Sequence, residues 1–447
     1  MLSFILTAVS QPRLVVDRLY ENVTQLAAFE TIAGYNVGVL NINGWLAWTI
    51  TIASCIGLWG GLCSIFRYKQ ERAMLQRFSY PDRASMAQMT NDDAQKILEH
   101  IMSYEFPLLY KFSLQFAIFK TYAFSTVSSM LAKTKSFSDP SSAPKRYEDT
   151  SVIFGEFSLN PPTSERCITA IARMNHLHNP YKKAGKISNA DMLYTLAVAA
   201  MEPIRFIRLY EWRALNDMEV CAIGTFWKSI GDAMEIEYKG YLTQEAWADG
   251  IEFVEDITRW AKNYEVEAMK PYPENKKLAD ALVGLLFFHV PESLRPFALE
   301  IMTVLMGDRI REAFMYPEPG IFAAFVAFGL LNARRIFLRY LCLPRMGPKK
   351  YFSEPDPHTG RIHHFDYLVS PYYNKPTFRA RWGPMALLTR MCGGSVPGGT
   401  GTMPEGFIAT DLGPMNRMGK GMEDMEVEMA RMKKSRPSGC PFAAHFG

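Results

Sequence analysis

The 447-residue chain lacks the short motifs that mark the best-known enzyme classes. It contains no HExxH, no Gly-x-Ser-x-Gly, no Rossmann glycine fingerprint and no clustered Cys/His zinc pattern. The fragment GGSVPGGTG around Gly393 has no strand before it and no Gly-Lys-Ser/Thr after it, which indicates an ordinary loop rather than a phosphate-binding loop. Motifs of this kind therefore assign no chemistry to the chain.

Cysteine and net charge are also scarce. The seven cysteines are odd in number, widely scattered and without a CxxC pair, so they predict neither a disulfide framework nor a zinc site, and a reducing compartment fits them best. The formal charge of +4 comes from 49 basic and 45 acidic residues, an imbalance too small to bind nucleic acid through its phosphates. We therefore exclude a nucleic-acid partner.

One long uncharged run stands out against these absences. Residues 44–66 read GWLAWTITIASCIGLWGGLCSIF, and at 1.5 Å per residue a helix of this length spans a hydrocarbon core of roughly 30 Å. Trp45, Trp48 and Trp59 suit the membrane interface. The run is followed at once by the basic residues Arg67, Lys69 and Arg72. The positive-inside rule then predicts a single-pass anchor with residues 1–43 in the lumen and the rest of the chain in the cytosol.

The N-terminal residues favour an uncleaved anchor over a signal peptide. Residues 1–10 have no basic n-region, and the apolar run lies too far into the chain for a signal sequence. The sequon at Asn22 would lie in the lumen, where glycosylation is chemically possible. An unmodified surface asparagine is the alternative.

After the anchor, the hydrophobic pattern predicts an all-α fold with a large helical bundle over residues 67–342. Apolar residues from Trp247 to Tyr264 recur at spacings of three and four after Thr243, a candidate N-cap. No run of alternating strands is present. Further helices are predicted at 92–103, 106–132, 164–178, 189–215, 219–236, 276–289, 293–314 and 320–342.

Residues 343–447 have a different character and are predicted to form an irregular C-terminal extension wrapped on the bundle. Up to about residue 414 they are rich in Pro, Gly, Tyr and Arg with little periodicity. A Met-rich amphipathic helix ends the extension, with methionines at 415, 418, 422, 425, 429 and 432. The mixed charge of its polar face favours docking on the protein over contact with a membrane surface.

Candidate site residues lie in a dense polar set that begins at Arg146, Asp149 and Thr150. On the following helix, Arg173 and His176 lie on one face together with Arg166, at separations of seven and three residues. This stripe of arginine and histidine can hold the anionic edge of a cofactor, stabilise a reduced oxygen species or line a solvated surface.

Three more candidates follow. His178 lies two residues beyond His176 and so points to another face, where it either caps the helix or serves as a metal ligand or acid–base group. Glu202 is the lone carboxylate of the run LYTLAVAAMEPIRFI, and Arg205 is placed to pair with it, as a catalytic pair or as a structural ion pair. His289 is expected to be a satisfied helix-end histidine.

Histidines of the extension are expected to be exposed. His358, His363 and His364 have an HxxxxHH spacing that does not suggest a metal site, because Asp356 and Arg361 flank them.

Four segments resemble a known family. They read NPPTSERCITAIARMNHLHNPYKKAGKISNADMLYTL, EPIRFIRLYEWRALNDMEVCAIGTFWKSIGDAMEIEYKGYL, GDRIREAFMYPEP and SPYYNKPTFRARWGP. These segments resemble the fungal ER-bound oxygenases typified by the mpaB enzyme of mycophenolic acid biosynthesis. More distantly, the helical core is similar to the bacterial latex-clearing rubber oxygenases.

The resemblance implies an oxygenase in the ER membrane that uses dioxygen to cleave a carbon–carbon double bond in an isoprenoid, farnesyl-type chain of a prenylated lipophilic substrate. The products would be a shortened aldehyde or acid. The bacterial relatives imply a b-type haem, with Arg173 binding or polarising oxygen and His176 or His178 near the metal.

The chain departs from the bacterial pattern in one respect. The helix that should supply the axial histidine, from Asp191 to Leu215, contains no histidine. Either His178 replaces that ligand, or a non-haem iron is held by His178 with Glu202. A function of another class also stays open, namely a non-catalytic membrane scaffold or lipid-binding protein.

Overall fold

The structure is a computed structural model that describes residues 44–134, 142–367, 369–435 and 439–442, so that Asn22 lies outside the described residues. It falls into two compact units, residues 1–59 and 60–447. The predicted all-α class is confirmed: within the described part of the chain, extended backbone is limited to two isolated bridges, Phe352 with His364 and Ile362 with Phe407.

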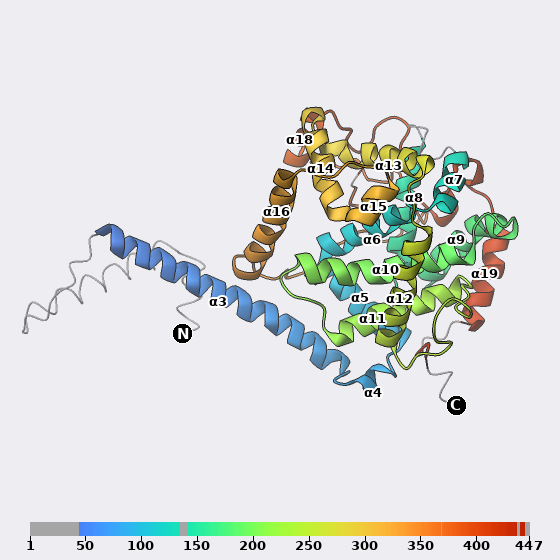
Figure 1. Cartoon of the computed structure of the whole chain (residues 1–447), viewed down its shortest axis with the longest axis horizontal. Helices are drawn as coiled ribbons and strands as arrows, with labels where there is room; N and C mark the ends of the chain where they lie inside the picture. Colours follow the sequence, from blue (N-terminus) through green and yellow to red (C-terminus); the bar gives the residue numbers. More distant parts are fainter. Residues whose placement is uncertain (1–43, 135–141, 368, 436–438, 443–447) are drawn as a thin grey trace, which may run out of the picture. The chain divides into compact units, whose positions relative to one another are not determined.

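Most of the chain is built from helices of ordinary length (Figure 1). Those before the extension are α3 (Gly44–Phe78), α4 (Arg83–Met86), α5 (Asn91–His100), η1 (Ile101–Glu105), α6 (Pro107–Thr121), α7 (Ser125–Thr134), α8 (Ala143–Leu159), α9 (Glu165–Lys183), α10 (Asn189–Tyr210), α11 (Asp217–Ala233), α12 (Gly250–Ala268), α13 (Pro273–Leu286), η2 (Phe287–His289), η3 (Glu292–Leu294), α14 (Arg295–Met306), α15 (Asp308–Ala313) and α16 (Ile321–Tyr340). The extension adds α17 (Phe378–Trp382), α18 (Pro384–Met391), η4 (Ala409–Asp411), η5 (Met415–Arg417) and α19 (Met422–Ser435).

Helix α3 contains the predicted anchor and continues well beyond it. The stretch Trp48–Phe78 is long and apolar enough to cross a membrane, which agrees with the predicted N-terminal span. A second helix, α16, meets the same criteria of length and composition. Both helices are largely unburied, so neither is an ordinary core helix.

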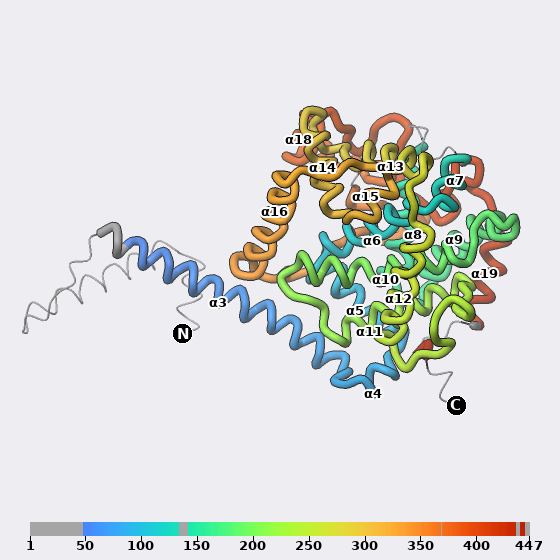
Figure 2. Tube along the Cα trace, in the orientation of Figure 1, coloured from blue at the N-terminus to red at the C-terminus, as the bar shows by residue number. Residues whose placement is uncertain are grey.

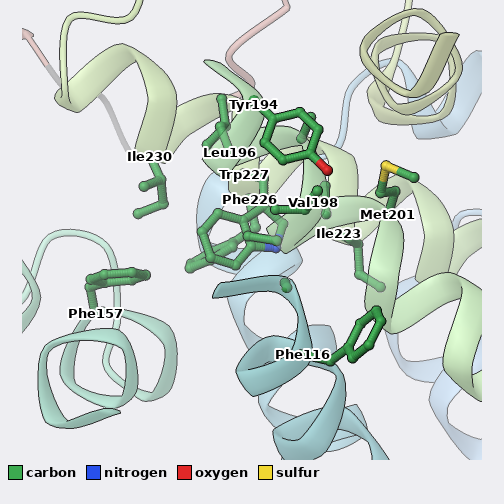
Figure 3. Close-up of a cluster of buried hydrophobic side chains, with 14 of the residues drawn as sticks. Phe116, Phe157, Tyr194, Leu196, Val198, Met201, Ile223, Phe226, Trp227 and Ile230 are labelled. Atoms are coloured by element: carbon green, nitrogen blue, oxygen red, sulfur yellow. The ribbon is translucent and has the colours of Figure 1, made fainter. Parts of the chain in front are cut away.

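Helix α10 is the centre of the bundle. Apolar or small side chains surround it on nearly every side, and it packs against α6, α11 and α12. Figure 3 shows aromatic side chains of α6, α8 and α11, Phe116, Phe157 and Trp227 among them, converging on this region. Burial of large side chains of this kind stabilises a fold by about 1.5–3 kcal/mol each.

Two glycines allow α11 and the start of α12 to touch. A Cβ placed on Gly224 would lie 1.9 Å from the carbonyl oxygen of Gly250, and a Cβ on Gly250 would lie 2.2 Å from the carbonyl oxygen of Cys221. Any side chain at either position would force the two backbones apart. The close crossing therefore requires glycine on both helices.

Side-chain caps begin several of the helices. Ser188 accepts a hydrogen bond from the backbone N–H of Asp191 and caps α10. The predicted cap at Thr243 is wrong, because α12 begins at Gly250 and is capped by Asp249. The backbone N–H of Thr243 instead donates to the carboxylate of Asp256, which also accepts from neighbouring groups and holds the segment in a turn.

Several predicted helix boundaries are corrected by local chemistry. The 106–132 helix divides into α6 and α7, where the amide of Asn275 donates to the carbonyl oxygen of Ala123. The 293–314 helix divides at Gly307, whose φ is +76°. The Met-rich helix starts at Met422 because Gly419 and Gly421 before it have φ of +69° and +90°.

Helix α8 was not predicted. Its sequence, APKRYEDTSVIFGEFSL, shows no single apolar face, because polar and apolar side chains are buried on several sides of the helix. Burial of polar residues at this density hides the period that identifies an amphipathic helix. The omission matters, because α8 forms one wall of the cavity described below.

The extension after α16 contains only short helices until α19. Figure 2 shows its orange-to-red trace passing from α18 to α19, which lies beside α9. Met425 and Met432 of α19 are fully buried, in agreement with docking on the protein.

Candidate active site

A cavity of about 90 Å³ lies between α6, α8 and the extension. Leu114 and Ile118 of α6 line one side and Phe154 of α8 lines another. The extension borders the cavity with Tyr351 and Phe352. This mostly apolar lining suits an apolar ligand or part of one.

Glycine in α8 sets the position of the Phe352 wall. A Cβ on Gly155 would lie 2.5 Å from two ring atoms of Phe352. The ring in turn stacks on His364, with centroids 4.9 Å apart and planes at 24°. The absence of a side chain at Gly155 thus allows the extension to approach α8.

Two polar groups of the lining are buried without a hydrogen-bond partner. They are the hydroxyl of Tyr147 and the amide nitrogen of Gln115. Burial raises the pKa of Tyr147, and the Glu148 carboxylate raises it further, so the hydroxyl remains a proton donor at neutral pH. Unsatisfied buried donors are costly, and a ligand with an acceptor atom would relieve that cost.

A buried histidine–carboxylate pair lies at the wall formed by Phe352. His364 lines the cavity and its Nδ1 contacts a carboxylate oxygen of Glu148, with both side chains buried. The expectation that His364 is exposed is wrong. Its backbone N–H donates to the carbonyl oxygen of Tyr373 and its own carbonyl accepts from Asn374, which draws the residue inward. His358, in contrast, is exposed as expected.

His178 lies near the end of α9 and is not part of this pair. Burial lowers the pKa of His178 to about 4, and the positive charges of Arg146 and Lys182 add to the effect, so the imidazole is neutral at physiological pH. Its Nδ1 is buried and has no hydrogen-bond partner. Arg146 donates a 3.0 Å hydrogen bond to Thr150, and Thr150 lines the cavity. Arg146, whose charge acts on the pKa of His178, therefore reaches the cavity wall through Thr150.

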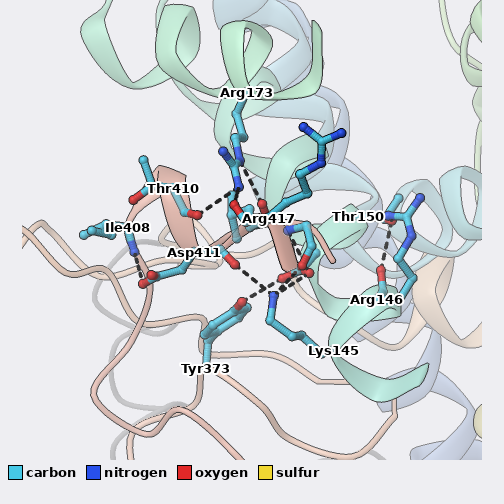
Figure 4. A network of polar contacts seen from close by, with 12 residues as sticks. Lys145, Arg146, Thr150, Arg173, Tyr373, Ile408, Thr410, Asp411 and Arg417 are labelled. Atoms are coloured by element: carbon cyan, nitrogen blue, oxygen red, sulfur yellow. Dashed lines mark hydrogen bonds and ion pairs between the residues drawn. The ribbon is translucent and has the colours of Figure 1, made fainter. Parts of the chain in front are cut away.

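Arg173 is fully buried beneath the extension, and its guanidinium group is hydrogen-bonded to it (Figure 4). Its Nε and two terminal nitrogens donate to four backbone carbonyl oxygens at 2.6–3.0 Å, those of Leu412, Lys420, Thr410 and Arg417. The remaining N–H faces the sulfur of Met425 at 3.9 Å. Every donor of Arg173 is thus used to hold the extension, and none is left to contact oxygen.

His176 takes part in the same attachment. Its Nδ1 lies 3.0 Å from a carboxylate oxygen of Asp424 in α19, and Gly421 packs directly against its ring. The face that carries Arg173 and His176 therefore meets the extension. The structure does not bring His176 and His178 together.

A second attachment comes from α8. Lys145 donates to the carboxylate of Asp149 and to the carbonyl oxygens of Asp411 and Gly413 (Figure 4). Asp149 also accepts from the hydroxyl of Tyr373 at 2.7 Å and from the backbone N–H of Gly413. The extension that closes the cavity is consequently fastened by buried groups of both α8 and α9.

Glu202 and Arg205 form the ion pair that their spacing indicated, at 2.7 Å. The other oxygen of Glu202 accepts from Lys120 at 2.9 Å, and Lys120 also pairs with Glu265. This buried chain of charges joins α6, α10 and α12. Both carboxylate oxygens of Glu202 are therefore engaged by cations.

The candidate irons differ in how many protein ligands they need. Among the described residues, no three His, Cys, Asp or Glu side chains lie together as the ligands of a protein-bound non-haem iron would. His178, whose pKa is lowered by burial so that the imidazole is neutral, would be the residue to hold a haem iron.

The fold and the site define the class: a helical, membrane-associated protein with a deep apolar cavity. Comparison with curated proteins shows which family it is. The chain is 40% identical over 389 residues to the ER-bound oxygenase mpaB′ of Penicillium brevicompactum, which covers 85% of this chain and 91% of that protein. No family model matches the chain.

Two further relatives have the same description. The ER-bound oxygenase mpaB of Penicillium brevicompactum is 38% identical over 358 residues, covering 79% of this chain and 85% of that protein. The ER-bound oxygenase mpaB of Penicillium roqueforti (strain FM164) is 40% identical over 258 residues, covering 58% of this chain and 87% of that protein. The chain belongs to this family of ER-bound oxygenases, which confirms the predicted enzyme class.

Proposed function

We propose that this oxygenase cleaves a carbon–carbon double bond in the isoprenoid chain of a prenylated, lipophilic substrate bound in the α6–α8 cavity. The observation that carries the proposal is the apolar cavity itself, whose wall includes Thr150, the hydrogen-bond partner of Arg146. A farnesyl-type chain, as in mycophenolic acid biosynthesis, has the apolar surface that this lining would bury. The product is a shortened aldehyde or acid.

The cleavage balances without an external reductant. Dioxygen supplies both oxygen atoms: the carbon–carbon double bond and the O–O bond break, and two carbonyl bonds form. Each fragment then carries one oxygen atom from dioxygen. An acid product requires a later oxidation of the aldehyde.

Within this proposal His178 would hold a haem iron, and the haem would supply dioxygen binding and redox chemistry. Burial, with a smaller effect of the positive charges of Arg146 and Lys182, lowers the pKa of His178 and keeps the imidazole neutral, as a ligand must be. The Tyr147 hydroxyl and the Gln115 amide, both without partners, orient polar parts of the substrate. Phe352 and Tyr351 exclude water from the cavity while Arg173 and Asp149 hold the extension in place.

The topology is part of the proposal. The anchor passes the membrane once, with residues 1–43 in the lumen and the helical body in the cytosol. A lipophilic substrate partitions into the same bilayer. Endoglycosidase treatment of the expressed protein tests this orientation, since only a lumenal Asn22 can be glycosylated, and an Asn22→Gln variant identifies the modified position.

The reaction is tested with the full-length protein in nanodiscs, a farnesylated aromatic substrate and ¹⁸O₂. We expect two carbonyl fragments by mass spectrometry, each with one ¹⁸O before exchange with water, and no consumption of an analogue with a saturated chain. A substrate that gains oxygen but keeps its chain intact would show a different oxygenase reaction. An unconsumed substrate, with haem content verified, would refute the proposal.

Two histidine variants test the site. We expect His178→Ala to abolish turnover and His289→Ala to retain it. His289 is a matched control, because burial also lowers its pKa, but it ends a helix and lies beside Thr389. Equal activity of the two variants would remove His178 from the site.

A further inference from the structure

Helix α16 exposes an apolar face that a water-soluble surface would not tolerate. Ile321 is 90% exposed, Phe325 75% and Phe322 69%. The same face carries the exposed side chains of Phe328 and Ile336. Contiguous exposed surface of this kind marks a site of contact with a membrane or a partner.

The opposite face of α16 is packed against the body along the length of the helix. Near the start, Ala323 and Ala327 are buried on this face, and Phe322, at the edge of the exposed face, contacts the ring of Phe297 of α14 with centroids 5.6 Å apart. Near the end, Arg334 pairs with Glu211 at 2.8 Å. A helix attached in this way cannot cross a bilayer alone, because its crossing would carry the body into the hydrocarbon.

The C-terminal end of α16 meets α3 at the point where the anchor ends. A Cβ on Gly60, inside the apolar span, would lie 3.5 Å from the carbonyl oxygen of Tyr340. Just beyond the span, Arg67 donates two hydrogen bonds to the carbonyl oxygen of Cys342, at 3.2 and 3.0 Å. The end of α16 therefore lies at the level of the membrane surface.

Charge on this segment also suits a bilayer. From residue 321 to residue 353 the chain contains no Asp or Glu. It contains six basic residues, Arg334, Arg335, Arg339, Arg345, Lys349 and Lys350. Basic residues next to an apolar face are the pattern of helices that lie in the interface of membranes with anionic lipids.

We propose that α16 is a second membrane-binding element, which lies flat in the headgroup region with its outward face, Ile321 to Ile336, inserted among the acyl chains. The occupant of this face is the lipid of the leaflet on the side of the body. Together with the anchor, α16 gives the body two points of attachment. Two points fix how the body is oriented on the membrane, which a single anchor does not.

Lipid photolabelling of the full-length protein tests this surface. Nanodiscs of phosphatidylcholine and phosphatidylserine carry a lipid with a diazirine in its acyl chain, and adducts are located by peptide mass spectrometry. We expect adducts on residues 321–337 as well as on the anchor. Labelling of α16 no greater than that around the exposed Val266 of α12 would overturn the proposal.

Substitutions and introduced sequons distinguish lipid contact of α16 from contact with a second copy of the protein and from a membrane-spanning α16. Phe322→Glu together with Phe325→Glu should reduce the α16 adducts several-fold, whereas Val266→Glu should not. Protein–protein cross-links on α16 in place of lipid adducts would assign the face to a second copy and contradict the proposal. A sequon placed before Ile321 or after Met346 should remain unglycosylated, and glycosylation at one end alone would show that α16 crosses the membrane.

Discussion

Removal of Arg173 should release the C-terminal extension from the body. The Arg173→Met variant keeps an apolar stem of similar length but loses all four hydrogen bonds to backbone carbonyl oxygens. Hydrogen bonds to a charged group are worth about 1.5–3 kcal/mol each, and four lost together leave buried acceptors unsatisfied. Because the extension can open locally and expose those carbonyls to water, we expect a smaller loss of about 4 kcal/mol.

Hydrogen–deuterium exchange measures this loss directly. A change of about 4 kcal/mol in local opening corresponds to roughly a thousandfold loss of amide protection, which we expect in residues 407–432. Helix α11 should keep its protection. In the Arg173→Lys variant, the amide protection of residues 407–432 should lie between that of the unmodified protein and that of Arg173→Met, since lysine has fewer donors and no fork geometry.

The same variants distinguish a structural Arg173 from one that contacts oxygen. If Arg173 acts through the extension, activity should fall together with protection in the Lys and Met variants. Full protection of residues 407–432 combined with lost turnover in Arg173→Lys would refute our reasoning and restore the direct role that the family resemblance implied.

Other changes follow from the same structure. Gly224→Ala should destabilise the protein by about 1–3 kcal/mol or more by overpacking, whereas Gly284→Ala, with open space around it, should be neutral or stabilising in thermal unfolding. Gly155→Ala should displace Phe352 and raise KM for the substrate with little change in the melting temperature; an unchanged KM would contradict the assigned wall. Because the pKa of His178 is lowered to about 4 in the fold, the unfolded chain binds more protons between about pH 6.5 and pH 4, so stability should fall as pH falls through that window. In haem-free protein, the stability of the His178→Gln variant should lack this dependence on pH. Identical profiles of stability against pH for the variant and the unmodified protein would show that His178 is not buried as a neutral ring.

The sequence predicted the all-α class, the apolar span and most helices, because these depend on local patterns of apolar residues and caps. It also predicted the Glu202–Arg205 pair, which needs only the spacing of three on a helix. Helix α8 was not predicted, because its polar residues are buried by partners far away in the chain. A pattern of exposure cannot be read from a helix that is covered on several sides.

The misplaced residues share one cause. His364 follows charged neighbours and looked exposed, yet contacts with Glu148 and Asn374 bury it. Arg173 looked like a ligand for oxygen, yet its partners are carbonyl oxygens more than two hundred residues later. Both depend on how the extension returns to the body, and no local signal in the sequence specifies that return.

The optical spectrum and iron content of the purified full-length protein test the central claim most directly, with His178→Ala and His289→Ala measured beside it. Our account predicts a Soret band and one haem iron per chain in the unmodified protein and in His289→Ala, and loss of both in His178→Ala. An unmodified protein that cleaves its substrate without a Soret band, or a His178→Ala variant that keeps its haem, would contradict the account.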